Sequence, residues 1–259
     1  MSVDPIDLAK FASLKYYNAA MSFLHAVSGF FILYLSNGFS FPVTTTYLSR
    51  NVFLNEVTPL TAEVFRIHGA FAVTSILFIC SFTHFLLILP KIHGWYLTGL
   101  KKGVNYMRWI EYSISSATMI VLIALLSGIF DLASLIMMFF LDSAMILFGL
   151  LSERLNTRDP KGGWAAFIFG CIIGLIPWAI ISMYILGAWQ NQATLIPSFV
   201  YRILITIFIF FNSFAVNAFL SKLKVGPWKD YIFTEKVYIF LSLTSKSALA
   251  WEIFAGTLM

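Results

Sequence analysis

Seven long apolar runs, separated by short clusters of charged and turn-forming residues, constrain this chain more than any other feature. A helix needs about 20 apolar residues to cross the hydrocarbon core of a bilayer. The runs lie at about 8–36, 66–90, 101–128, 132–153, 164–188, 197–221 and 232–256. Only 11% of the 259 residues are charged, whereas a soluble domain carries about 25%, so a soluble enzyme and a disordered chain are excluded. The two cysteines, Cys80 and Cys171, fall inside these runs and are expected to pack as small core residues.

The runs predict an all-α membrane protein, a seven-transmembrane helix bundle that forms one domain over residues 1–259. Alternating polar and apolar residues are absent from the runs, which disfavours a membrane β-barrel. The long first loop, 37–64, contains the segment PVTTTYL at 42–48, and its Thr and Val residues favour extended structure. We therefore expect a short β element in this loop, outside the membrane.

The basic residues predict how the bundle is oriented. Only Arg50, Arg66 and Arg202 fall on the side of the first loop. Most of the 17 Lys and Arg residues fall on the opposite side, at positions 10, 15, 91, 101, 102, 154, 158, 161, 222, 224, 229 and 236. The positive-inside rule then predicts a multi-pass protein of the cell membrane with a cytoplasmic N-terminus and an extracellular C-terminus. No basic cluster accompanies a soluble fold, so we expect no nucleic-acid partner.

A few ionisable side chains lie inside the runs, where such groups are costly and usually functional. Counting a rise of about 1.5 Å per residue from the nearest cytoplasmic basic residue places His25, His84, Glu111 and Lys246 all roughly 10–15 Å deep. Arg108, three residues before Glu111, shares its helix face. Four groups from four helices at one depth indicate a single polar site.

Lys246 has no carboxylate one turn away on its own helix, and a bare ammonium ion inside a bilayer is costly. It either loses its proton, pairs with a carboxylate and thereby locks two helices together, or is covalently modified. A lysine amine in an apolar pocket forms a Schiff base readily. A protonated Schiff base would need a counterion, and Glu111 is the only acid expected at the same depth.

Two motifs carry a resemblance to known retinal proteins. Arg-Trp-Ile-Glu-Tyr at 108–112, with a lysine in the last span, resembles the microbial rhodopsins. The chain departs from their ion-pumping members, because Glu111 replaces an Asp and Ser242 stands where a second acid usually precedes the lysine. The segments MRWIEYSISSATM (107–119) and SLTSKSALAW (242–251), with the paired His25 and His84, resemble the heliorhodopsins, which are inverted in the membrane relative to other rhodopsins. This resemblance covers essentially the whole chain.

The resemblance implies all-trans retinal, bound as a Schiff base on Lys246 with Glu111 as its counterion. It also implies that eight further side chains lie near the cofactor: Ser242, Ser116, Trp109, Tyr112, Met145, Asp142, Trp178 and Phe211. A proton-accepting region would contain His25, His84 and Arg108. The family further implies a homodimer in contact with membrane lipids, and a slow photocycle driven by isomerisation from all-trans to 13-cis.

Three functions remain open from the sequence. The first is a light-sensing photoreceptor with an unidentified signalling partner and no enzymatic activity. The second is a light-gated passive proton channel, whereas outward pumping is disfavoured because a second acid near Lys246 is missing. The third is a membrane enzyme that binds a metal through His25, His84 and Glu111. No HxxxH or HxxE spacing supports that third function, and it leaves Lys246 without a role, so we expect no metal site.

Overall fold

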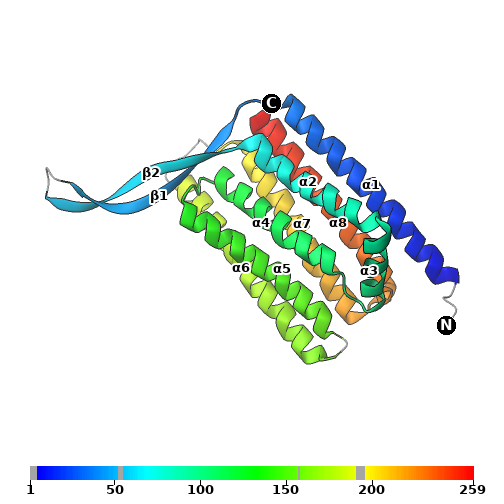
Figure 1. Ribbon diagram of the computed structural model, residues 1–259. Helices are drawn as coiled ribbons and strands as arrows, with labels where there is room; N and C mark the ends of the chain where they lie inside the picture. The colour runs from blue at the N-terminus through cyan, green and yellow to red at the C-terminus, as the bar shows by residue number, and fades with distance from the viewer. Residues whose placement is uncertain (1–4, 52–54, 157, 191–195) are drawn as a thin grey trace.

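The computed structural model describes residues 5–51, 55–156, 158–190 and 196–259. These residues form a bundle of long helices, with a two-stranded hairpin that projects from one end and a short helix at the other (Figure 1). The elements in chain order are α1 (Pro5–Leu35), β1 (Ser40–Asn51), β2 (Glu56–His68), α2 (Gly69–Ile88), α3 (Pro90–Lys101), α4 (Tyr106–Leu126), α5 (Leu132–Leu155), α6 (Pro160–Gln190), α7 (Ser198–Leu223), η1 (Gly226–Lys229), α8 (Tyr231–Ile253) and η2 (Phe254–Leu258). The predicted fold class, a helical membrane bundle with a small β element, is confirmed.

Six helices in the described part of the chain are long and apolar enough to cross a membrane: α1, α2, α4, α5, α6 and α7. The last helix, α8, has 23 residues and therefore a length of about 35 Å. It carries Glu235, Lys236, Lys246 and Glu252, which make it less apolar than the others. It packs between α7 and α1. The two termini lie at opposite ends of the bundle (Figure 1), as an odd number of crossings requires.

The hairpin is longer than the sequence predicted. Its antiparallel strands pair from Ser40 with His68 to Asn51 with Glu56, so β2 continues beyond residue 66, where a membrane span was expected to begin. Its base is anchored because Phe41 and Val43 are buried in the core. A backbone hydrogen bond of 2.8 Å from Thr44 to Phe130 adds to this anchor. The rest of the hairpin extends away from the helices (Figure 1).

The short helix α3 was not predicted, and the expected start of the third span at 101 was wrong. Pro90 occupies the first turn of α3, where its fixed φ and missing N–H cost nothing. Gly103 has a positive φ of 71°, a backbone conformation that favours glycine. The Asn105 side chain then accepts a hydrogen bond from the backbone N–H of Arg108 at 3.1 Å and caps α4. The break between α3 and α4 thus lies where the sequence predicted continuous helix.

Apolar clusters toward the two ends of the bundle and a polar layer between them divide the interior along the bundle axis. One apolar cluster, at the hairpin end, includes Ile32, Leu77 and Leu249. The other, near the N-terminal end, includes Leu14, Leu87 and Ile239. Between them on α1, α2, α4 and α8 lies a layer of buried polar residues: Asn18, His25, Cys80, His84, Glu111, Ser242 and Lys246. Apolar side chains close this layer off on the hairpin side, whereas His84 and Asn18 continue it toward the N-terminal end.

Candidate functional site

The centre of the polar layer is an ion pair between α4 and α8. Lys246 Nζ lies 2.8 Å from Glu111 Oε1, and the two side chains are 3% and 4% exposed. The ammonium also donates to Ser242 Oγ at 3.0 Å, one turn earlier on the same helix face. Its Nζ lies 4.5 Å from the centroid of the Tyr112 ring, within the range of a cation–π contact. The buried charge of Lys246 therefore has a carboxylate, a hydroxyl and an aromatic face around it.

A second helix, α2, reaches the same carboxylate. The thiol of Cys80 donates to Glu111 Oε1 at 2.9 Å. One turn further along α2, His84 Nδ1 lies 2.7 Å from Asn18 Oδ1 on α1. The His84 ring stacks on His25, with centroids 6.1 Å apart. Neither nitrogen of His25 has a hydrogen-bond partner within the described residues, so this imidazole is a buried polar group whose hydrogen-bonding capacity is unused.

Arg108 lies in a different cluster from the two histidines. Its guanidinium pairs with Glu153 of α5 and Glu235 of α8, and it lies over the ring of Tyr238 at 4.0 Å. None of the contacts seen for it among the described residues is with His25 or His84. The sequence had grouped these three side chains in one proton-accepting region, and the structure separates the arginine from the imidazoles.

The sequence analysis did not predict the two acids that pair with Arg108. Glu235 accepts further hydrogen bonds from Tyr96 at 3.2 Å and Asn105 at 2.6 Å, and it is almost fully buried. Glu153 accepts from Trp109 Nε1 at 2.6 Å. Each acid is followed by a basic residue in the chain, which made both resemble solvated residues at a helix end. The available signal was Arg108 itself, because a buried guanidinium requires an acidic partner.

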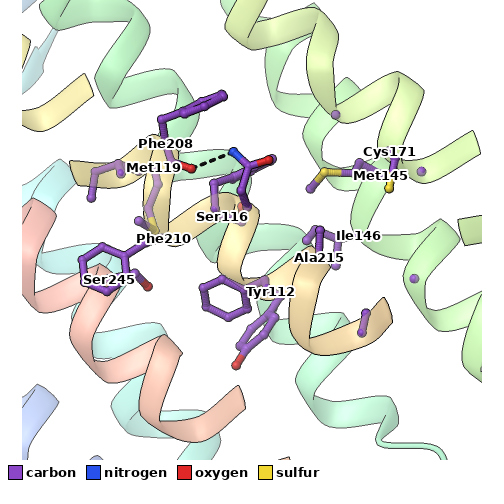
Figure 2. Close-up of a pocket in the computed structure, with 18 of the residues that line it drawn as sticks. Tyr112, Ser116, Met119, Met145, Ile146, Cys171, Phe208, Phe210, Ala215 and Ser245 are labelled. Atoms are coloured by element: carbon purple, nitrogen blue, oxygen red, sulfur yellow. Dashed lines mark hydrogen bonds between the residues drawn. The ribbon is translucent and has the colours of Figure 1, made fainter. Parts of the chain in front are cut away.

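A cavity of about 300 Å³ lies between α4, α5, α6, α7 and α8, and Lys246 is one of its lining residues. Seven of the residues expected near a cofactor line it: Trp109, Tyr112, Ser116, Met145, Trp178, Phe211 and Lys246. Figure 2 shows Tyr112, Ser116 and Met145 around the space, with Phe208 and Phe210 completing the wall. The walls are almost entirely apolar and aromatic, which suits a long hydrophobic ligand.

Three expected cofactor residues do not line the cavity wall. Glu111 and Ser242 contact the Lys246 ammonium from the polar layer. Asp142 is fully buried on α5, and neither of its carboxyl oxygens has a hydrogen-bond partner within the described residues. Cys171, expected in the core, is instead exposed on α6 at the edge of the cavity.

The comparisons with known proteins decide the family. The sequence model of the heliorhodopsin family matches residues 14–258. The chain belongs to the heliorhodopsin family. No curated protein sequence is similar enough to the chain to count as a match. Among solved structures, the crystal structure of cyanorhodopsin N4075R from the cyanobacterium Tolypothrix sp. NIES-4075 is similar, with a TM-score of 0.57 and 10% identity over 99% of this chain and 96% of that chain. At that identity the likeness shows a common rhodopsin fold.

Family and fold agree with the site. This heliorhodopsin is an integral membrane protein of the retinal-binding photoreceptor type, and the family implies a retinal chromophore. The residues present fit such a group, because a buried lysine lines an apolar cavity. Among the described residues, no group of three or more His, Cys, Asp or Glu side chains lies close enough together to hold a metal ion.

The Arg108 cluster generates a stability prediction. Arg108→Gln leaves Glu235 buried without a cation, and we expect the free energy of unfolding to fall by about 3–5 kcal/mol. The control is Arg66→Gln, because Arg66 and its partner Glu63 are about half exposed and such pairs contribute about 0–1 kcal/mol. Denaturant unfolding of both variants in detergent measures the difference. Equal losses would contradict the role assigned to the cluster.

Proposed function

We propose that this heliorhodopsin is a light-sensing photoreceptor, with retinal carried by Lys246 and with Glu111 as the counterion. The observation that carries the proposal is the position of Lys246 Nζ. Lys246 lines an apolar cavity, and its Nζ lies 2.8 Å from the only carboxylate that contacts it within the described residues. An amine there can condense with an aldehyde to give a C=N bond, and the aldehyde oxygen leaves as water.

Retinal, when bound, would supply light absorption and the isomerisation from all-trans to 13-cis. The chain's own residues hold and move the charge that accompanies this event. The free ammonium donates to both Glu111 and Ser242. The protonated Schiff base keeps a single N–H, and Glu111 would accept it and keep the lysine nitrogen positively charged in the dark. Glu111 would receive the proton on illumination, with His84 and His25 as the adjoining groups of the polar layer. Since the resemblance to the heliorhodopsins implies a slow photocycle, we propose one for this protein.

The packing around Lys246 supports sensing over ion pumping. On the hairpin side of the lysine lies the apolar cluster that includes Leu77, Ile123 and Leu249. Ser242 occupies the position one turn before Lys246, so that turn of the helix offers no second acid. A pump needs titratable groups on both sides of the transported proton. On the hairpin side of Lys246, α8 carries Glu252, which contacts Thr206 of α7, whereas the polar groups around the ion pair continue toward the N-terminal end.

The remaining features of the proposal concern orientation and assembly. The distribution of basic residues supports a cytoplasmic N-terminus and an extracellular hairpin. The hairpin exposes Leu48 and Val57, which are 72% and 62% accessible, and exposed apolar side chains outside a bilayer favour a protein contact. We propose a homodimer that covers this surface, embedded in membrane lipid, and a signalling partner of unknown identity.

A light-gated passive proton channel is the second candidate. The observation that favours it is a run of polar contacts that leads from His84 to Asn18 and resumes at Tyr96 and Glu235. This run could conduct protons on the N-terminal side of Lys246. The apolar cluster on the hairpin side would still have to open.

Photocurrent recording at both signs of membrane voltage separates the two candidates. We expect no sustained current from cells that express the protein with retinal, because the apolar cluster that includes Leu77 and Leu249 blocks the outer half. A current that reverses with the proton gradient would instead establish the channel.

The covalent attachment predicts a visible absorption band that depends on Lys246. Protein expressed with all-trans retinal should show such a band, and Lys246→Ala should abolish it because no other lysine lines the described cavity. The absorption spectra of the two purified proteins provide the measurement. A parent protein without a visible band would break the proposal and leave Lys246 and Glu111 as a structural ion pair.

The counterion assignment predicts the effect of Glu111→Gln. Without this carboxylate, we expect the visible band to shift to longer wavelength or to be lost, and to disappear at lower pH, because the positive charge loses its partner. Glu252→Gln is the matched control on α8, since Glu252 contacts Thr206 of α7 at 3.3 Å. Spectra recorded across a pH titration test both variants. If Glu111→Gln leaves the titration unchanged, Glu111 is not the counterion, and Asp142 is the next residue to test.

A further inference from the structure

We propose that Cys80 is a positioning residue for Glu111, and that its thiol sets how strongly this carboxylate holds the charge on Lys246. The inference rests on the proposed function of the Lys246–Glu111 pair and adds a third side chain to it. It concerns a residue that composition and sequence pattern assigned to simple core packing.

The geometry places two donors on one oxygen atom. Glu111 Oε1 accepts from Lys246 Nζ at 2.8 Å and from Cys80 Sγ at 2.9 Å. Cys80 is a free, fully buried thiol, so water does not compete for this contact. The three residues come from α2, α4 and α8, which means that the thiol approaches the carboxylate from a helix that carries neither member of the ion pair.

The position of Cys80 along α2 argues against packing as its only role. Leu77, three residues earlier, belongs to the apolar cluster at the hairpin end, whereas His84, four residues later, belongs to the polar layer. Cys80 thus lies at the boundary of the two regions. A buried cysteine usually behaves as a small apolar residue with a weak S–H donor, and here that donor points at a buried carboxylate.

The donor strength of the thiol has an electrostatic consequence. A hydrogen bond to a carboxylate draws negative charge away from the cation that shares the same oxygen. A thiol is a weaker donor than a hydroxyl, so Cys80 leaves more of the charge on Oε1 available to Lys246 than a serine would. Removing the donor, as in Cys80→Ala, would leave even more of the charge on Oε1 available to Lys246. The two directions of change make the proposal testable.

The first test uses the protein without retinal and reads the thiol directly. A Cys171→Ser background leaves Cys80 as the only thiol, because the sequence contains two cysteines. Infrared spectroscopy then records the S–H stretching band in this background and after a further Glu111→Gln change. We expect the band to move to higher frequency in the second protein, because a neutral amide accepts a weaker hydrogen bond than a carboxylate. An unmoved band overturns the proposal.

The second test reads the charge on Lys246 after retinal is added. In the same background, Cys80→Ala should shift the visible band to shorter wavelength and raise the pH at which it disappears, by about one pH unit. Cys80→Ser should shift the band to longer wavelength and lower the pH at which it disappears. If both variants have the same visible band as the background and lose it at the same pH, the proposal is overturned. If the background itself forms no visible band, the proposed function fails, and the S–H band, which needs no retinal, still decides whether the thiol serves the carboxylate.

Discussion

A buried ion pair between Lys246 and Glu111 governs the arrangement of this bundle. Both side chains are almost fully enclosed, and removing two charges from water costs several kcal/mol for each ion before their attraction is counted. The cost is offset only if α2, α4 and α8 come close enough to place Cys80 and Ser242 around the pair. The apolar clusters above and below this layer then fix how deep the pair lies.

The protein contains two buried charge centres that are built differently. Arg108 is held by two acids, and those acids are hydrogen-bonded in turn by Tyr96, Asn105 and Trp109. Lys246 has one acid and borders an apolar cavity. The first centre ties α4, α5 and α8 together through both terminal nitrogens of the guanidinium, and only Arg108 Nε has no hydrogen-bond partner within the described residues. Near the second centre, His25 has no hydrogen-bond partner within the described residues, so a change of charge on Lys246 meets a polar group that can respond.

The sequence was sufficient for the features that depend on counting along a helix. Depth and helix face placed Glu111 and Lys246 in one layer, because the rise per residue is fixed. It was insufficient where a contact depends on lateral packing. Glu235 was hidden beside Lys236 at a helix end, and Cys80 resembled any small core residue, since nothing in the sequence states which neighbouring helix each faces. The break between α3 and α4 depended on Gly103, a single turn residue.

The asymmetry of the interior has a consequence for how light could act on the rest of the molecule. Toward the hairpin, the space beyond Lys246 is filled by aliphatic side chains such as Leu77 and Leu249, and such packing tolerates charge poorly. Toward the N-terminal end, His84 and Asn18 lead to the region where Tyr96 on α3 contacts Glu235. On the proposed function, a proton displaced from the lysine would be accommodated on that side. The short helix α3, which lies there against α2 and α4, is the element of the fold best placed to move in response.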